Sequence, residues 1–163
     1  MFRRLLNMAT RTRKDSSTPL MSEIFTKVNN AKTKDKKIQV LRDYDNQGLR
    51  MVVKASFDPD IIWVLPAEDP PFIPNDSPAG EQHTYLISEA KKLYRFVKGG
   101  HDDLNQLKRE SLFISMLESL QEEEAIVLLR AKNKELHKHY KGLSKEVVKE
   151  AFGWNDNYML KDV

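Results

Sequence analysis

The strongest chemical signal in the sequence is a basic stretch in its C-terminal half, where residues 125–149 contain seven bases and two acids. Clustered lysines and arginines can bind phosphate groups, and a tyrosine among them could stack on a nucleobase. This pattern indicates a candidate nucleic-acid-binding site. The alternative is a solvated helix face followed by a loop, which is the more common origin of a charge run. The candidate residues are Arg130, Lys132, Lys134, Lys138, Tyr140, Lys141 and Lys145.

Patterns for catalysis and metal binding are weak. The chain has no cysteine, and it has no HExxH motif, nucleophile elbow or nucleotide-binding loop. His137 and His139 are two residues apart and would face different sides of a helix. His101 with two neighbouring aspartates forms another partial set, but neither group supplies a convincing three or four ligands. We therefore expect a protein that is not an enzyme and that has no metal and no cofactor.

A helix-turn-helix motif can be drawn from residues 105–118 and 121–132, but its charge is wrong. The second helix would present Glu122, Glu123 and Glu124 in its first turn. In that motif the first turn of the recognition helix approaches the bases, within a dense field of phosphates. We interpret the three acids instead as partners of the helix dipole.

The basic character of the chain is concentrated at its N-terminus. Five bases and one acid lie within residues 1–20, whereas the remaining residues include 22 bases and 23 acids. The charge of the remaining body therefore does not by itself indicate nucleic-acid binding. We predict that residues 1–20 form a disordered extension upstream of a true start at Met21. The alternatives are an organellar presequence and a disordered arm that touches phosphate.

Residues 58–80 hold six of the seven prolines and no base. Seven large apolar residues lie between these prolines, which is more apolar surface than a polar linker carries. We predict an extended, ordered segment packed across the helices, because buried aromatic residues usually pack a core. The alternative is a proline-rich docking peptide. The candidate partner-binding residues of this segment are Trp63, Pro70, Pro71 and Phe72.

The rest of the chain has the apolar spacing of short helices. Caps predict helices that begin at Ser22, at Thr33, at Thr84 or a neighbour, at Ser119 with Glu122 in a capping box, and at Ser144. The helix near Thr84 is expected to run to Lys98, and two further helices are expected at residues 47–57 and about 105–118. Leu107 belongs to the apolar residues of the helix at 105–118, and Trp154 is expected to fold back onto the core. We expect an all-α bundle of about six or seven short helices, crossed by the extended segment. It forms a single domain at residues 21–157, followed by a C-terminal tail at residues 158–163. No apolar run has the length that a membrane span needs, so we expect no membrane partner.

Several short motifs together resemble an uncharacterised family of T-even-like tailed phages, especially those infecting cyanobacteria. They are Phe57-Asp58-Pro59, Trp63-Val64-Leu65-Pro66, Pro70-Pro71-Phe72, Glu89-Ala90-Lys91-Lys92-Leu93-Tyr94, Phe96-Val97-Lys98-Gly99-Gly100, Leu112-Phe113-Ile114, Met116-Leu117-Glu118, Tyr140-Lys141-Gly142-Leu143 and Val148-Lys149-Glu150-Ala151-Phe152. The resemblance covers residues 22–154 and brings no known activity. It implies a phage protein without a presequence.

These features lead to an expected function. We expect an accessory protein in the host cytoplasm, which binds a phage or host protein or nucleic acid and acts on replication or transcription. A minor structural component of the virion is the alternative, and an enzyme of unrecognised type is the third possibility.

Overall fold

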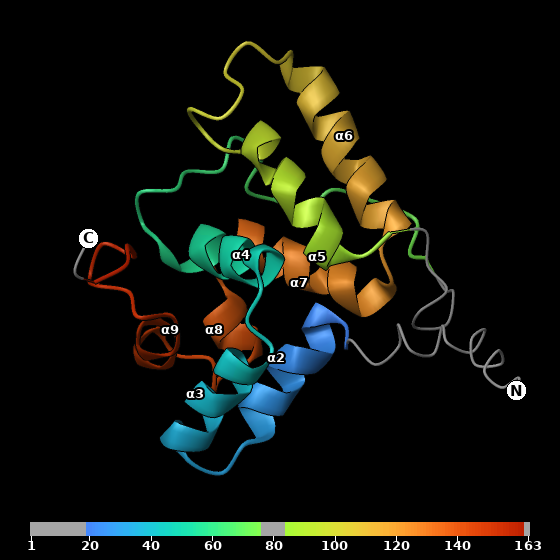
Figure 1. The fold of residues 1–163 in the computed structure, drawn as a ribbon. Coiled ribbons are helices and arrows are strands. Elements are labelled where there is room, and N and C mark those ends of the chain that lie inside the picture. The colour runs from blue at the N-terminus through green and yellow to red at the C-terminus, as the bar shows by residue number, and fades with distance from the viewer. Residues whose placement is uncertain (1–18, 76–83, 162–163) are drawn as a thin grey trace, which may run out of the picture.

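The computed structural model describes residues 19–75 and 84–161, and within these ranges the fold is all-α (Figure 1). The predicted extension before Pro19, and the proline-rich residues 76–80, lie outside the described residues. The described part has eight α-helices, one 3-10 helix and three isolated β-bridges. The elements are α2 (Met21–Asn30), α3 (Lys34–Asp43), α4 (Gln47–Phe57), α5 (Leu86–Glu89), η1 (Ala90–Phe96), α6 (Gln106–Ser119), α7 (Glu122–Lys132), α8 (Leu136–His139) and α9 (Lys145–Phe152).

Helix α7 is central to the packing, because it contacts α2, α4, α6 and α8. In Figure 1, α2 and α3 lie at one end of the molecule and α6 lies at the other. Helix α3 packs on α2 and on α9, so it connects the two. The apolar faces of these helices meet in a core that fully buries Phe25, Leu49, Phe113, Leu117 and Leu128. Burial of this apolar surface is the main force that holds the short helices together.

Two caps follow the sequence prediction. Thr33 and Ser144 accept hydrogen bonds from the first turns of α3 and α9. Asn105, where a helix was predicted to begin, caps α6 in the same way. The bounds of α4 are also as predicted. These helices are predictable because a side-chain acceptor at the N-cap satisfies a backbone N–H group that the helix leaves unpaired.

Two predicted caps were wrong. Ser22 is buried inside α2, which begins one residue earlier with Leu20 as its N-cap. Leu20, which was counted in the disordered extension, is buried, and its N–H group donates to Glu23. Ser119 is the last residue of α6, and Gln121 caps α7 instead.

The helix predicted for residues 84–98 is replaced by the short α5 and by η1. Helix α5 packs closely on α4. A Cβ atom at Gly48 would lie 2.3 Å from the carbonyl oxygen of Ile87, so the close approach requires glycine. Val97, directly after η1, is extended and pairs with Trp63 before the chain turns at residues 98–100. Leu107, which the spacing placed inward, is 76% exposed.

The C-terminal residues continue the packed body beyond the predicted boundary at residue 157. Gly153 ends α9 in the left-handed conformation, with φ of 68°, and Trp154 folds back into the core as expected. Tyr158 is also buried, and its ring lies 6.0 Å from that of Trp154. The first part of the predicted tail therefore belongs to the folded body.

Candidate nucleic-acid interface

The structure places the predicted basic residues in different environments instead of on one face. The ammonium group of Lys132 is buried, and it donates to the carbonyl oxygens of Pro66 and Ala67 at 2.9 and 3.3 Å. Lys134 donates to the carbonyl oxygen of Asp58 at 2.6 Å. Burial lowers the pKa of both lysines. These two side chains hold the segment at residues 58–67 and are not available as a phosphate-binding surface.

Glu135 forms ion pairs with two further bases of the stretch. Its carboxylate lies 3.5 Å from Arg130 and 3.6 Å from Lys138. Exposed ion pairs of this kind contribute little to stability, but they offset charge locally. The acid was visible in the sequence, but its position between the two bases depends on the turn between α7 and α8.

The predicted stacking role of Tyr140 is wrong, because the side chain is 6% exposed and packs 5.5 Å from the ring of Phe25. Burial, with smaller contributions from Glu123 and Glu124, raises the pKa of Tyr140 to about 12. Tyr140 is therefore a core residue. A base cannot stack on a ring whose faces are already covered.

Lys141, in the loop before α9, and Lys145, at the start of α9, remain exposed, and this loop contacts the end of α2. The N–H group of Gly142 donates to Oδ1 of Asn29 at 2.7 Å. Lys37 strengthens the same corner, because its ammonium group donates to the carbonyl oxygens of Val28, Asn29 and Ala31 at the C-terminus of α2. A cation at a helix C-terminus is favourable because it meets unpaired carbonyl groups and the negative end of the dipole.

This contact brings together two lysine-rich segments that are about 110 residues apart in the sequence. We call residues 27–37 and 139–146 the lysine end. Together they contain seven lysines and two acids, Asp35 and Glu146, whereas the rest of the chain after residue 20 has 15 bases and 21 acids. The charge of the folded body is therefore strongly segregated. The lysines are Lys27, Lys32, Lys34, Lys36, Lys37, Lys141 and Lys145.

The first of these segments was not recognised as a basic site from the sequence. The run Lys32-Thr33-Lys34-Asp35-Lys36-Lys37 has four lysines and one acid. It is as basic as the stretch that was singled out, but it was interpreted only as a helix start. The signal was present, although its contact with residues 139–146 could not be inferred from spacing.

Gly142 controls the approach of the two segments. A Cβ atom at this position would lie 2.9 Å from Nζ of Lys37 and 3.0 Å from Cα of Asn29. We expect Gly142→Ala to lower the free energy of unfolding by about 1–3 kcal/mol, because the loop must shift or Lys37 must leave its carbonyl partners. Urea unfolding measures this change. Lys141→Ala in the same loop is the control, with an expected change below about 0.5 kcal/mol; equal stability of both variants would contradict the close packing.

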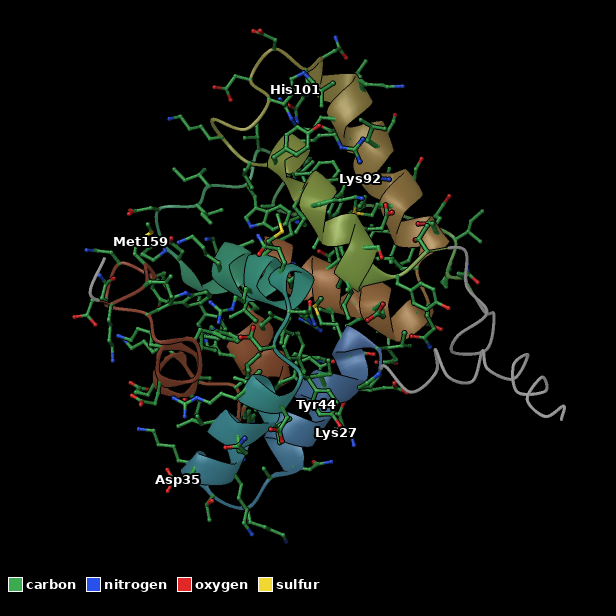
Figure 2. The ribbon with its side chains drawn as sticks, in the orientation of Figure 1. Lys27, Asp35, Tyr44, Lys92, His101 and Met159 are labelled. Atoms are coloured by element: carbon green, nitrogen blue, oxygen red, sulfur yellow. The ribbon has the colours of Figure 1, made fainter. Side chains whose placement is uncertain are left out.

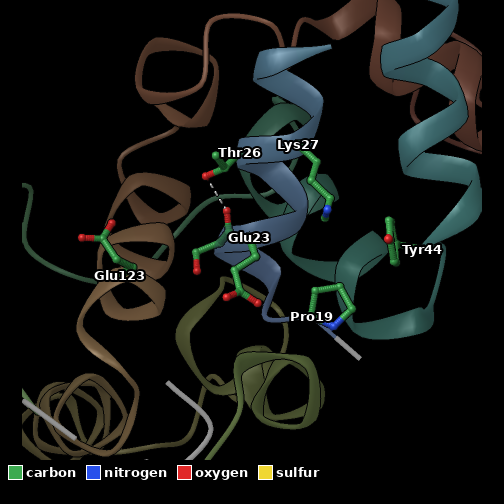
Figure 3. Close-up of a pocket in the computed structure, with 7 residues that line it drawn as sticks. Pro19, Glu23, Thr26, Lys27, Tyr44 and Glu123 are labelled. Carbon is green, nitrogen blue, oxygen red and sulfur yellow. Dashed lines mark hydrogen bonds between the residues drawn. The ribbon is translucent and has the colours of Figure 1, made fainter. Parts of the chain in front are cut away.

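A hollow beside the lysine end is lined mainly by α2 (Figure 3). Its volume is about 700 Å³ and its lining includes Glu23, Lys27, Tyr44 and Glu123. Thr26 at its wall donates to the carbonyl oxygen of Ser22 at 2.9 Å, so this hydroxyl serves the helix. The hollow has mixed charge, and Lys27 connects it to the lysine end.

Of the four candidate partner-binding residues, Trp63 lines a second hollow of about 640 Å³, which lies between the segment at residues 59–69 and the turn after α7. Trp63 lies in its wall, but its indole N–H group donates to the carbonyl oxygen of Ala55 at 3.0 Å, and its ring meets Phe113 edge-on. Phe72 is half-buried against the core, Pro70 is half-buried and Pro71 is exposed. Trp63 and Phe72 thus contribute to packing.

The first turn of α7 places one carboxylate where it organises the start of α2. Glu124 is 1% exposed. Its Oε2 accepts from the N–H groups of Met21 and Ser22 at 2.7 and 3.4 Å, and its Oε1 accepts from Leu86 at 3.0 Å. Burial raises the pKa of Glu124, and the three hydrogen bonds oppose that rise. This residue therefore joins the N-termini of α2 and α5, a role that the sequence analysis did not assign to it.

Other chemistry-bearing residues do not converge. Among residues 19–75 and 84–161, no three histidine or carboxylate side chains are placed to hold a metal ion. The ring of His101 stacks on Tyr94, and Asp102 accepts a hydrogen bond from Gly99. In the same part of the chain, no helix is both long and apolar enough to cross a membrane.

The fold and its charge pattern define a small all-α protein with a segregated basic surface. More particularly, the chain belongs to a family of unknown function, DUF6433, whose model matches residues 24–138. The match includes α2 through most of α8, and hence the first segment of the lysine end. No curated protein and no solved structure gives a significant match.

Proposed function

We propose that this chain is a non-enzymatic phage accessory protein that binds nucleic acid through the lysine end in the cytoplasm of the infected cell. The observation that carries the proposal is the gathering of seven lysines and two acids from two distant segments. The protein acts there on replication or transcription as a binding module.

The physical argument is electrostatic. Lysines on a common surface neutralise phosphates and release condensed counterions, which supplies most of the affinity of non-specific nucleic-acid binding. The acidic remainder of the body repels a polyanion, so it also orients the nucleic acid toward the lysine end. Lys32 in the α2–α3 turn and Lys34 and Lys36 in the first turn of α3 are exposed, and Asp35 in this segment marks its position in Figure 2.

A direct test is to map the contact by NMR, using full-length ¹⁵N-labelled protein and an unlabelled 12-base-pair DNA duplex. We expect chemical-shift changes to concentrate at residues 27–37 and 139–146. The amides of η1 and α6 provide an internal control, because these elements lie at the other end of the molecule (Figure 1). Shifts confined to residues outside the lysine end would overturn the proposed site, and the absence of any shift at low salt would overturn nucleic-acid binding.

We also propose that residues 58–75 act as a structural segment that closes over the helices, instead of as a docking peptide. Supporting contacts are spread along it: Val64 donates to the carbonyl oxygen of Phe96, Lys132 binds two carbonyl groups, and Ile73 donates to Glu118. The half-buried Trp63, Leu65 and Phe72 pack against the core.

Lys132→Met tests this structural role. It removes the ammonium group that binds the carbonyl oxygens of Pro66 and Ala67. Because these residues are near solvent, water can replace the lost donor, and we expect a loss of about 1–2 kcal/mol in the free energy of unfolding. Hydrogen exchange should become faster in residues 61–67 in particular. Lys138→Met is the matched control, since Lys138 is exposed; unchanged exchange in Lys132→Met would show that the lysine does not hold the segment.

The proposed cytoplasmic role differs from that of a virion component in a measurable way. Mass spectrometry of purified particles should find no stoichiometric amount of the chain. Stoichiometric recovery from particles would favour the structural alternative.

A further inference from the structure

We infer that the lysine end binds the sugar–phosphate backbone of duplex nucleic acid and does not read or stack on the bases. This inference rests on the proposed function and makes it specific, because it names duplex in preference to single strands as the ligand class.

The types of side chain at the lysine end favour backbone contacts. Residues 27–37 and 139–146 contain lysine but no arginine. The commonest base-specific contact is a bidentate one from arginine to guanine, and lysine acts more often as a point charge toward phosphate. Asn29 is engaged with Gly142. The surface therefore offers many mobile charges and few rigid groups that could read base edges.

The lysine end offers little aromatic surface on which single-stranded bases could stack. Proteins that bind single strands combine positive charge with exposed rings on which bases stack. At the lysine end Tyr140 is buried, and the exposed His139 ring packs edge-on against Tyr140, with centroids 4.6 Å apart. Tyr94, which is 51% exposed, belongs to η1 and stacks with His101. His101 lies at the opposite end of the molecule from Asp35 (Figure 2).

The arrangement of charge also suits a duplex. The lysines come from several elements, so they form a face instead of a narrow groove that could follow one strand. Lys27 belongs to α2, Lys34, Lys36 and Lys37 to the start of α3, Lys145 to the start of α9, and Lys32 and Lys141 to the connecting chain. A duplex presents one phosphate charge per roughly 1.7 Å of its axis, which is about twice the density of either strand. A surface that relies on charge alone gains most from the ligand of higher charge density.

The test compares three fluorescent ligands by anisotropy at low salt: a 20-base-pair DNA duplex, a second duplex of scrambled sequence and the single strand dT20. The protein is the full chain with Arg3, Arg4, Arg11, Arg13 and Lys14 replaced by Gln, so that the folded body determines the result. We expect both duplexes to bind with the same affinity within about 2-fold, and at least about 10-fold more tightly than dT20.

The outcomes separate the inference from the proposed function. Equal or tighter binding of dT20 that is lost when Lys34, Lys36, Lys141 and Lys145 are changed to Glu would overturn the duplex preference but keep nucleic-acid binding. A difference of more than about 10-fold between the two duplexes would overturn backbone-only recognition. Failure to bind any of the three ligands would overturn both.

Discussion

Glu124→Ala should destabilise the protein by about 3–5 kcal/mol, as measured by urea unfolding followed by circular dichroism. The substitution leaves the N–H groups of Met21, Ser22 and Leu86 without their shared acceptor. Each buried unpaired donor costs about 1–3 kcal/mol, and the weak 3.4 Å bond to Ser22 contributes least. Because one carboxylate holds the starts of α2 and α5, the loss should exceed that of an ordinary helix cap.

The chemistry of this site can be separated from its shape. Glu124→Gln keeps the volume, but its amide NH₂ group faces backbone donors and can accept from none of them, so we expect a smaller loss of about 1–3 kcal/mol. Glu122→Gln is the matched control, because Glu122 is exposed in the same turn of α7. A loss below about 1 kcal/mol in Glu124→Ala would contradict the role assigned to this carboxylate.

The second large effect concerns binding. Changing Lys34, Lys36, Lys141 and Lys145 together to Glu should weaken the affinity for a 20-base-pair duplex by at least about 100-fold at low salt. Four attractive contacts are replaced by four repulsive charges on the same face. Fluorescence anisotropy measures the affinity, and the loss should be the same for duplexes of different sequence, because phosphate contacts are uniform.

The matched control changes four exposed lysines outside this face to Glu. They are Lys91, Lys98, Lys108 and Lys161. It alters the net charge by the same amount, so it reports the effect of overall charge alone. We expect this control to lose much less affinity than the lysine-end variant, and both proteins should keep the helical circular dichroism of the wild type. Equal loss in the two variants would show that net charge, and not the lysine end, determines binding.

The sequence predicted the parts of the fold that depend on local chemistry. Thr33, Asn105 and Ser144 cap helices because their side chains reach backbone groups a few residues away. The range 47–57 was predicted for α4 because its apolar residues follow helical spacing and a proline follows soon after. Each of these signals is contained within about one or two turns of chain.

Features that depend on distant contacts were not predictable in the same way. The burial of Tyr140 depends on Phe25, and the positions of Lys132 and Lys134 depend on carbonyl groups of residues 58–67. The chain between η1 and α6 and the short helix α8 are also fixed by packing. The seven bases of the stretch at residues 125–149 are therefore two structural lysines, three bases paired with acids and two exposed lysines.

The candidate site also depends on distant contacts that the sequence does not reveal. Lysine content alone identified Lys141 and Lys145, which remain on the surface. Their partnership with Lys32, Lys34 and Lys36 depends on the bond between Gly142 and Asn29 and on Lys37 at the end of α2. Composition identified the charge, but only tertiary packing gathered it on one end of the body.

The salt dependence of duplex binding tests the central claim most directly. The affinity of the chain with the five N-terminal bases replaced by Gln should fall with salt along a log–log slope of about −4 to −5, as expected if Lys32, Lys34, Lys36, Lys141 and Lys145 contact phosphates. In the four-lysine variant the slope should approach zero. A slope near zero in the protein that keeps these lysines, or an unchanged slope in the four-lysine variant, would contradict a phosphate-binding role for the lysine end.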